Sequence, residues 1–224
     1  MSLFEETDDD GRVTMRCQLD DGLLQGLMER FSPQGQLTMR AFFKDGNLHG
    51  PLALYSDAGE LIQEAGYHEG VPHGLLRIHA NARCIAEQTW VHGEQTGPSR
   101  SFDPAGNLSS LMTYKSGQID GEARFYHEGA EVRRSVYRQG LLEGESVDLD
   151  VQGAIVQLCT YRKNVLHGPV RRYWPDGTLM EELVYEQGKP VAPPRRYDAK
   201  GERVDNEKAS ESVLERLRQL VRGD

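Results

Sequence analysis

Cysteine is scarce in this 224-residue sequence, which contains only Cys17, Cys84 and Cys159. The three residues lie 67 and 75 positions apart, and no Cys-x-x-Cys pair is present. An odd number of cysteines without a paired spacing is typical of proteins from a reducing compartment. The first residues, MSLFEETDDDG, also lack the basic and apolar segments of a secretory signal. We therefore expect a cytoplasmic protein.

Long apolar runs and catalytic motifs are missing as well. No segment approaches the ~18 consecutive apolar residues of a membrane-spanning helix. The sequence has no Gly-x-Ser-x-Gly elbow, no His-Glu-x-x-His pair and no phosphate-binding Walker loop. It also has no enlarged insertion that would build a lid or a deep pocket. We therefore expect no catalytic residues, no cofactor and no metal site, and interpret the chain as a binding protein rather than an enzyme.

Glycine, in contrast, is abundant and regularly spaced. The segment KDGNLHGPLALYSDAGEL (44–61) has glycines at 46, 50 and 59, and each of these positions recurs. The first recurs every 23 or 24 residues, at Gly22, Gly46, Gly70, Gly93, Gly117, Gly140, Asn164 and Gly188. The second follows four residues later, with Ala192 in the last copy, and the third is interrupted only near Ala82. This period predicts a stacked array of eight repeats.

An aromatic residue precedes the first glycine by three positions in seven of the eight repeats. The column consists of Phe43, Tyr67, Trp90, Tyr114, Tyr137, Tyr161 and Tyr185, with Leu19 in the first repeat. Residues of one column in successive hairpins line up across a sheet. We therefore expect the column to form a structural spine along one face of the sheet.

One repeat has the pattern of a β-hairpin. In LTMRAFF (37–43) the side chains alternate as in a strand, KDGNLHG turns the chain, PLALYS is a second strand and DAGE is the return turn. Eight such hairpins predict an all-β fold, an elongated antiparallel β-meander over residues 12–204. The low mean hydropathy of −0.62 agrees with a single sheet stabilised by neighbouring repeats. The segments HANARC (79–84) and KPVAPP (189–194) depart from the pattern, so we expect irregular turns there.

These columns resemble the MORN repeat, and more closely its bacterial variant in the YwqK-like antitoxin family. The residues that carry the resemblance are the aromatic and glycine columns, with LHG at 48–50 and 166–168 and PHG at 72–74. The resemblance covers residues 12–204. It implies a repeat fold and an antitoxin or immunity function, although glycine and tyrosine columns report hairpin geometry rather than chemistry.

The two ends of the chain differ from the repeats. Residues 1–11 are acidic and predict an N-terminal tail. Residues 205–224 change to a helical period, with Val213, Leu214, Leu217, Leu220 and Val221 on one stripe. A C-terminal amphipathic helix on a repeat array most often covers the exposed end of the sheet. Docking of a partner on this helix is the alternative.

Seven histidines are present, and three of them directly precede the second glycine. These are His49, His73 and His167, whereas His68, His79, His92 and His127 are scattered over other columns. A metal site needs three or four converging ligands. We therefore interpret the turn histidines as residues that close a turn by a hydrogen bond, and metal binding as the alternative.

Charge is distributed unevenly along the chain. The net charge is −9, and residues 1–112 contain 16 acidic and 8 basic residues, whereas the second half is almost balanced. An acidic surface repels nucleic acid and anionic membranes and attracts a basic protein. Solubility alone is the other explanation. The candidate partner-binding residues in this half are Asp20, Asp21, Asp45 and Asp57.

Two functions are compatible with the sequence. The first is an antitoxin or immunity protein that neutralises a cognate bacterial toxin by direct protein–protein binding. The second is a non-catalytic MORN-type scaffold for protein assembly or phospholipid contact, in which the net charge of −9 disfavours the lipid branch.

Overall fold

The computed structural model describes residues 1–204. The predicted C-terminal helix lies outside the described residues. The chain divides into two compact units, Met1–Gln118 and Ile119–Asp224, which we call unit 1 and unit 2. The described residues are all-β, as predicted, and every strand pairing within a unit is antiparallel.

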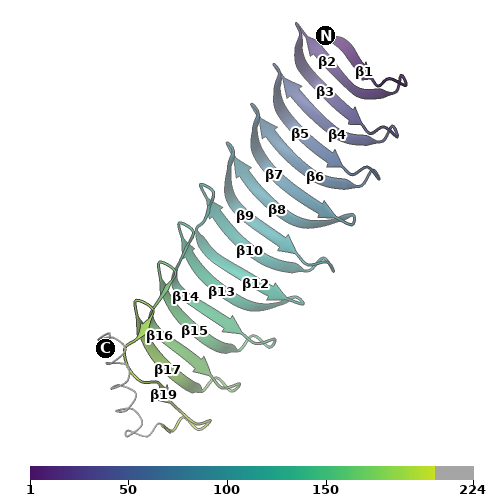
Figure 1. The fold of residues 1–224 in the computed structure, drawn as a ribbon. Coiled ribbons are helices and arrows are strands. Elements are labelled where there is room, and N and C mark those ends of the chain that lie inside the picture. The colour runs from purple at the N-terminus through teal and green to yellow at the C-terminus, as the bar shows by residue number, and fades with distance from the viewer. Residues whose placement is uncertain (205–224) are drawn as a thin grey trace, which may run out of the picture. The chain divides into compact units, whose positions relative to one another are not determined.

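Unit 1 is a meander in which each strand pairs with the next one along the chain (Figure 1). Its strands are β1 (Ser2–Thr7), β2 (Val13–Asp20), β3 (Leu23–Phe31), β4 (Leu37–Lys44), β5 (Asn47–Tyr55), β6 (Leu61–His68), β7 (Val71–Ala80), β8 (Arg83–Val91), β9 (Glu94–Phe102) and β10 (Leu108–Lys115). The short strand β11 (Gln118–Ile119) lies at the boundary between the units.

Unit 2 repeats this arrangement. Its strands are β12 (Gly121–His127), β13 (Ala130–Arg138), β14 (Leu141–Leu149), β15 (Ile155–Arg162), β16 (Val165–Tyr173), β17 (Leu179–Glu186), β18 (Lys189–Pro190) and β19 (Arg195–Arg196). Strand β17 pairs with both short strands. They are separated by a segment that contains Pro193 and Pro194, which have no N–H to donate to a ladder. The irregular turn expected at 189–194 is therefore confirmed.

The first glycine column forms two-residue hairpin turns. Asp45 and Gly46 have φ angles of 50° and 79°, and Lys44 pairs with Asn47 across the turn. Two consecutive positive φ angles define a type I′ turn, which favours glycine or asparagine because other side chains are strained there. Asn164, with φ 67°, satisfies the same requirement. The Gly46 N–H also donates to Leu24 O of the preceding hairpin at 2.9 Å, and the equivalent bond recurs along both units.

The opposite ends of most hairpins carry a longer return turn, as predicted. In Ser56–Gly59 the Gly59 N–H donates to Ser56 O, and the Ser56 hydroxyl accepts N–H groups from Ala58 and Glu60. The HANARC segment differs, because Ala80 pairs with Arg83 around a two-residue turn. This turn is regular but shorter, which explains why this repeat has 23 residues rather than 24.

Residues 1–11, predicted to be an acidic tail, contain strand β1 and a return turn. Strand β1 pairs with β2 along most of its length. At Asp8–Gly11 the Gly11 N–H donates to Asp8 O, and the Asp8 carboxylate accepts N–H groups from Asp10 and Arg12. This is the same turn as in the repeats, so the acidic run includes one more hairpin connection. The Asp-x-x-Gly spacing at 8–11 is the sequence signal for it.

Most of the core is a row of small or apolar side chains across the middle of each unit. In unit 1 the row pairs Cys17 with Met28, Met28 with Ala41, Ala41 with Leu52 and Leu52 with Ala65, and all five are buried. In unit 2 the equivalent row contains serine as well as apolar residues. Cross-strand partners share a sheet face, so this row lies on one face of each sheet, whereas the buried Val147 of unit 2, which pairs with Arg134 and Leu158, lies on the other face.

Candidate partner-binding surface

The aromatic column and the second glycine column lie directly opposite each other. In unit 1 the pairs are Gly26 with Phe43, Gly50 with Tyr67, Gly74 with Trp90 and Gly97 with Tyr114. In unit 2 they are Gly121 with Tyr137, Gly144 with Tyr161 and Gly168 with Tyr185. A glycine has no side chain, so it leaves room for the ring on the neighbouring strand. The two sequence columns are therefore two halves of one cross-strand contact.

The second glycine lies in a β-bulge. Residues 49–51 of β5 face a single residue of β4, because Leu48 pairs with Phe43 and Leu52 with Ala41. Gly50 has φ 110°, and a Cβ atom there would lie 3.4 Å from Phe42 Cβ. The bulge needs a residue that tolerates positive φ, and it bends each hairpin at the same position.

The aromatic rings lie on the same face as the core row, since they follow it by two residues along each strand. Phe43 and Tyr67 pack against the buried cluster of Ala41, Leu52 and Ala65. All seven aromatic residues of the column are half-buried. These two rings therefore contribute to the core, and every ring of the column still presents part of its surface. We call this side of each unit the aromatic face.

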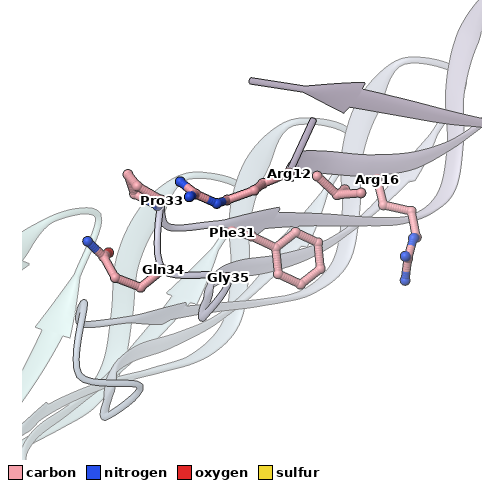
Figure 2. Close-up of a pocket in the computed structure, with 7 residues that line it drawn as sticks. Arg12, Arg16, Phe31, Pro33, Gln34 and Gly35 are labelled. Carbon is pink, nitrogen blue, oxygen red and sulfur yellow. The ribbon is translucent and has the colours of Figure 1, made fainter. Parts of the chain in front are cut away.

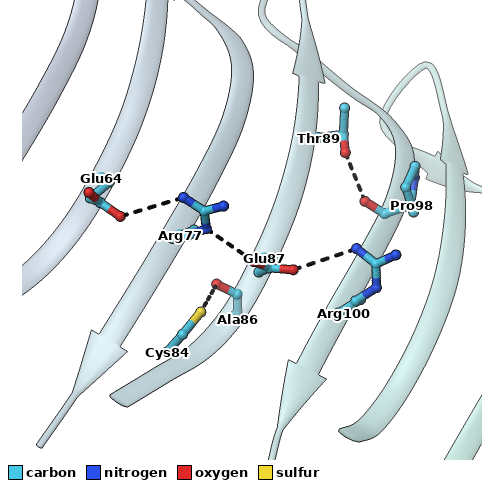
Figure 3. Close-up of polar contacts among 8 residues, drawn as sticks. All are labelled: Glu64, Arg77, Cys84, Ala86, Glu87, Thr89, Pro98 and Arg100. Carbon is cyan, nitrogen blue, oxygen red and sulfur yellow. Dashed lines mark hydrogen bonds and ion pairs between the residues drawn. The ribbon is translucent and has the colours of Figure 1, made fainter. Parts of the chain in front are cut away.

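The other side of unit 1 carries a ladder of alternating charges. Arg77 lies between Glu64 and Glu87, with Arg77 Nη1 3.8 Å from Glu64 Oε2 and Nε 3.0 Å from Glu87 Oε1 (Figure 3). Glu87 Oε2 is also 3.5 Å from Arg100 Nη1. The hydrogen bond to Glu87 raises the pKa of Arg77. Because positive and negative side chains alternate from strand to strand, this face is nearly neutral locally.

Strand arginines of unit 2 are paired in the same way. Arg171 Nε lies 2.7 Å from Glu182 Oε2, and Arg195 Nη1 lies 3.5 Å from Glu182 Oε1. Arg133 binds Asp148 through both Nε and Nη2, which raises the pKa of Arg133. The acidic side chains of these strands therefore already form ion pairs with neighbouring arginines.

A hollow of about 520 Å³ interrupts the aromatic face of unit 2. Its floor includes the Ser135 and Ser146 hydroxyls, which are hydrogen-bonded at 2.7 Å, and its lining includes Tyr137 and Tyr161. Burial raises the pKa of the Tyr161 phenol, so the ring carries a neutral hydroxyl at neutral pH. The hollow has the size and the mixture of aromatic and polar groups that suit a side chain of a partner protein.

A second hollow, of about 630 Å³, lies in unit 1 beside the Pro33–Gly35 turn (Figure 2). Arg12 extends toward this turn, and Arg16 lies at the other end, with its guanidinium carbon 6.0 Å from the centroid of the Phe31 ring. Both arginines already have carboxylate partners, since Arg12 Nη1 is 3.1 Å from Asp10 Oδ2 and Arg16 Nε is 2.7 Å from Glu5 Oε1. The arginines are therefore neutralised rather than available for an anion.

The predicted acidic residues do not form one cluster. Asp20, Asp21 and Asp45 lie at type I′ turns, at the same end of their hairpins. Asp20 is 3.1 Å from the amino terminus. Asp57 lies in the Ser56–Gly59 return turn, at the opposite end of its hairpin. The structure thus brings three of the four to one edge of unit 1 and places the fourth on the other edge.

Four histidines form a row that the sequence did not predict. The ring centroids are 4.8 Å apart for His49 and His68, 5.8 Å for His68 and His73, and 5.1 Å for His73 and His92. The description of His68 and His92 as scattered was wrong, because the bulges bring their columns together. His73 Nδ1 accepts the His92 N–H at 3.4 Å, so His73 does close a turn, as predicted. In residues 1–204 no group of three or more His, Cys, Asp or Glu side chains has the geometry to hold a metal ion.

Two segments of the chain match the MORN repeat variant. The matched residues are 95–116 and 166–187. Each segment contains one aromatic residue of the column and one glycine from each of the second and third glycine columns. No curated protein matches the chain. Over residues 1–204 the structure contains no helix that is long and apolar enough to cross a membrane.

Some solved structures contain regions that are similar to this chain. A crystal structure of TarM is 14% identical over 40% of this chain, with a TM-score of 0.31, and that of a TcdB2–TccC3–Cdc42 complex is 13% identical over 87%, with a TM-score of 0.22. The chain spans only 18% of the TarM chain and 14% of the second chain.

Proposed function

We propose that this chain is a non-catalytic, cytoplasmic binding protein that neutralises a cognate bacterial toxin by direct protein–protein contact. The observation that carries the proposal is the aromatic face, on which a half-buried ring lies opposite a glycine in seven of the eight repeats. Half-buried aromatic residues are the side chains that most often supply binding energy at protein interfaces. The resemblance to the YwqK-like antitoxin family is the reason for proposing a toxin as the partner.

Charge supports a basic partner surface near unit 1. The first 112 residues contain 16 acidic and 8 basic residues. Asp20, Asp21 and Asp45 gather at one edge. Exposed charges act mainly on the association rate, and salt screens them. The aromatic face would then hold the complex after the acidic edge has attracted the partner.

The experiment is co-expression with the toxin encoded beside this gene, followed by pull-down and growth rescue. We expect a one-to-one complex and restored growth. Replacing Asp20, Asp21 and Asp45 together by Lys should slow association at low salt by more than tenfold, with a smaller effect at high salt. Asp57→Lys is the matched control because it changes a turn charge at the opposite edge. A toxin that is neither bound nor inhibited would exclude the proposal.

A scaffold for protein assembly is the second candidate, and the two matches to the MORN repeat variant are the observation that favours it. A scaffold has several partners and inhibits none of them. Pull-down of the same partner without growth rescue would support the scaffold. Binding to anionic vesicles would support its lipid branch, which the net charge of −9 disfavours.

A further inference from the structure

The basic side chains of unit 2 fall into two groups that sequence alone does not separate. The strand arginines Arg133, Arg171 and Arg195 all have carboxylate partners. Arg138 and Arg162, the last residues of β13 and β15, and the turn residue Lys163 have none among residues 1–204. All three of these side chains are exposed. We call Arg138, Arg162 and Lys163 the turn strip.

The backbone at Lys163 and Asn164 is held by hydrogen bonds to the preceding hairpin. The Lys163 N–H donates to Glu143 Oε2 at 2.9 Å, and the Asn164 N–H donates to Leu142 O at 3.0 Å. The Asn164 side chain returns a bond, since its Oδ1 accepts the Leu142 N–H. The Glu143 carboxylate therefore binds the Lys163 backbone, and the Lys163 ammonium group has no ion pair among residues 1–204.

A hollow of about 350 Å³ lies at this turn. It is lined by Arg162, Lys163, Val165, His167 and Gln187. The lining contains two permanent cations, an imidazole and an amide, and it contains no carboxylate. These groups are all able to donate hydrogen bonds to a carboxylate. Val165 provides an apolar wall for the methylene groups of an acidic side chain.

The turn position of Lys163 differs in charge between the two units. Lys163 occupies the position of Asp21, Asp45, Glu69, His92 and Ser116, whereas the position of Arg162 is mixed in unit 1, with Asp20, Lys44, His68, Val91 and Lys115. The turn position of Lys163 thus carries an acid in three of the five hairpins of unit 1, and in unit 2 it carries a cation only at Lys163, between Gln139 and Gln187. A change of sign at a fixed structural position is not required by the fold, because turns of both kinds have the same φ angles.

We propose that the turn strip of unit 2 binds carboxylate side chains of an acidic segment of a partner protein. The proposal rests on the proposed function only in requiring a protein as the partner. A discrete acidic segment fits better than a membrane or a nucleic acid for two reasons. The hollow has room for only one or two side chains. In addition, Glu143 and Glu186 lie at the same hairpin ends and would repel a continuous polyanion.

The test uses a fluorescent ten-residue peptide with Glu at alternate positions, measured by fluorescence anisotropy at about 20 mM and about 200 mM salt. We expect binding at low salt, loss of about tenfold in affinity in Lys163→Glu, and a larger loss when Arg162→Ala is added. Glu69 occupies the equivalent turn position with φ 49°, so Lys163→Glu preserves the turn. Lys200→Glu, in the Asp198–Gly201 return turn, is the matched control and should bind as well as wild type.

Four results would overturn the proposal. The first is no peptide binding at low salt, and the second is an equal loss in Lys163→Glu and Lys200→Glu. The third is tighter, Lys163-dependent binding to phosphatidylserine vesicles or duplex DNA than to the peptide. The fourth is a dimer of the free protein that Lys163→Glu dissociates in sedimentation, because the strip would then be filled by a second copy. None of these measurements requires the toxin, so they separate this proposal from the proposed function.

Discussion

Replacement of Tyr67 by Ala tests whether the aromatic column is part of the core. Tyr67 lies opposite Gly50 on one neighbouring strand and Pro72 on the other. It packs against the buried cluster of Ala41, Leu52 and Ala65. No other large side chain faces Gly50 from β6, so the truncated position would leave both the glycine and the core row more exposed.

The expected loss follows from the burial of the ring. Truncation of a fully buried aromatic side chain costs about 3–5 kcal/mol. Tyr67 is half-buried, so we expect Tyr67→Ala to lower the free energy of unfolding by about 2 kcal/mol, roughly half of that value. Tyr67→Phe should cost less than about 0.5 kcal/mol, because the ring itself carries the packing.

Urea unfolding followed by circular dichroism measures these differences. Ile62→Ala is the matched control, since Ile62 lies on the opposite face of β6 and is 41% exposed. It should cost less than about 1 kcal/mol. If Tyr67→Ala costs no more than Ile62→Ala, the ring does not support the core, and the column is only a binding surface.

Three further predictions concern the ladders and turns. Glu87→Gln removes the carboxylate shared by two arginines, so it should lower the free energy of unfolding by about 1 kcal/mol and make stability less dependent on salt in urea titrations. Hydrogen bonds from Asn107 lower the pKa of Asp103, so this carboxylate stabilises the folded state above its ordinary pKa of 3.8, and the stabilisation is lost as the pH falls through the lowered value. The difference in Tm between wild type and Asp103→Ala should therefore be constant near pH 7 and narrow below about pH 3.8; a difference that widens in acid would contradict the assignment. Asn164→Gly should lower the free energy of unfolding by about 1 kcal/mol through the lost side-chain bond, whereas Asn164→Val should lower it by at least about 2 kcal/mol because a β-branched residue is strained at φ 67°. Calorimetry or urea unfolding measures both differences.

The fold could be predicted from the sequence because glycine reports backbone geometry directly. Gly46 and Gly59 marked the two kinds of turn, and the structure has a turn with positive φ at both. The aromatic column was predicted as a row on one face. Its pairing with the second glycine column was not, because that contact depends on the bulge at residues 49–51, which changes the register between neighbouring strands.

The surface features could not be predicted for the same reason. His49 and His68 are 19 residues apart, and only the bulge and turn geometry of two hairpins brings their rings within 4.8 Å. The unpaired cations of unit 2 could not be predicted for a different reason. Arg162 and Arg171 look alike in the sequence, and their difference appears only when Glu182 is found across the strands from Arg171. Such pairing depends on register, which local sequence specifies weakly.

The bond from each type I′ turn to the preceding hairpin has an evolutionary consequence. The Gly46 N–H binds Leu24 O, the Gly70 N–H binds Leu48 O, and the Gly188 N–H binds Leu166 O, so donor and acceptor occupy the same repeat positions each time. Removing one whole hairpin would bring together a donor and an acceptor that already fit each other, and duplicating one would do the same. A gene encoding this chain can therefore lengthen or shorten its product by 23 or 24 residues at a time, and the number of rings and charges offered to a partner can change without a new contact inside the protein.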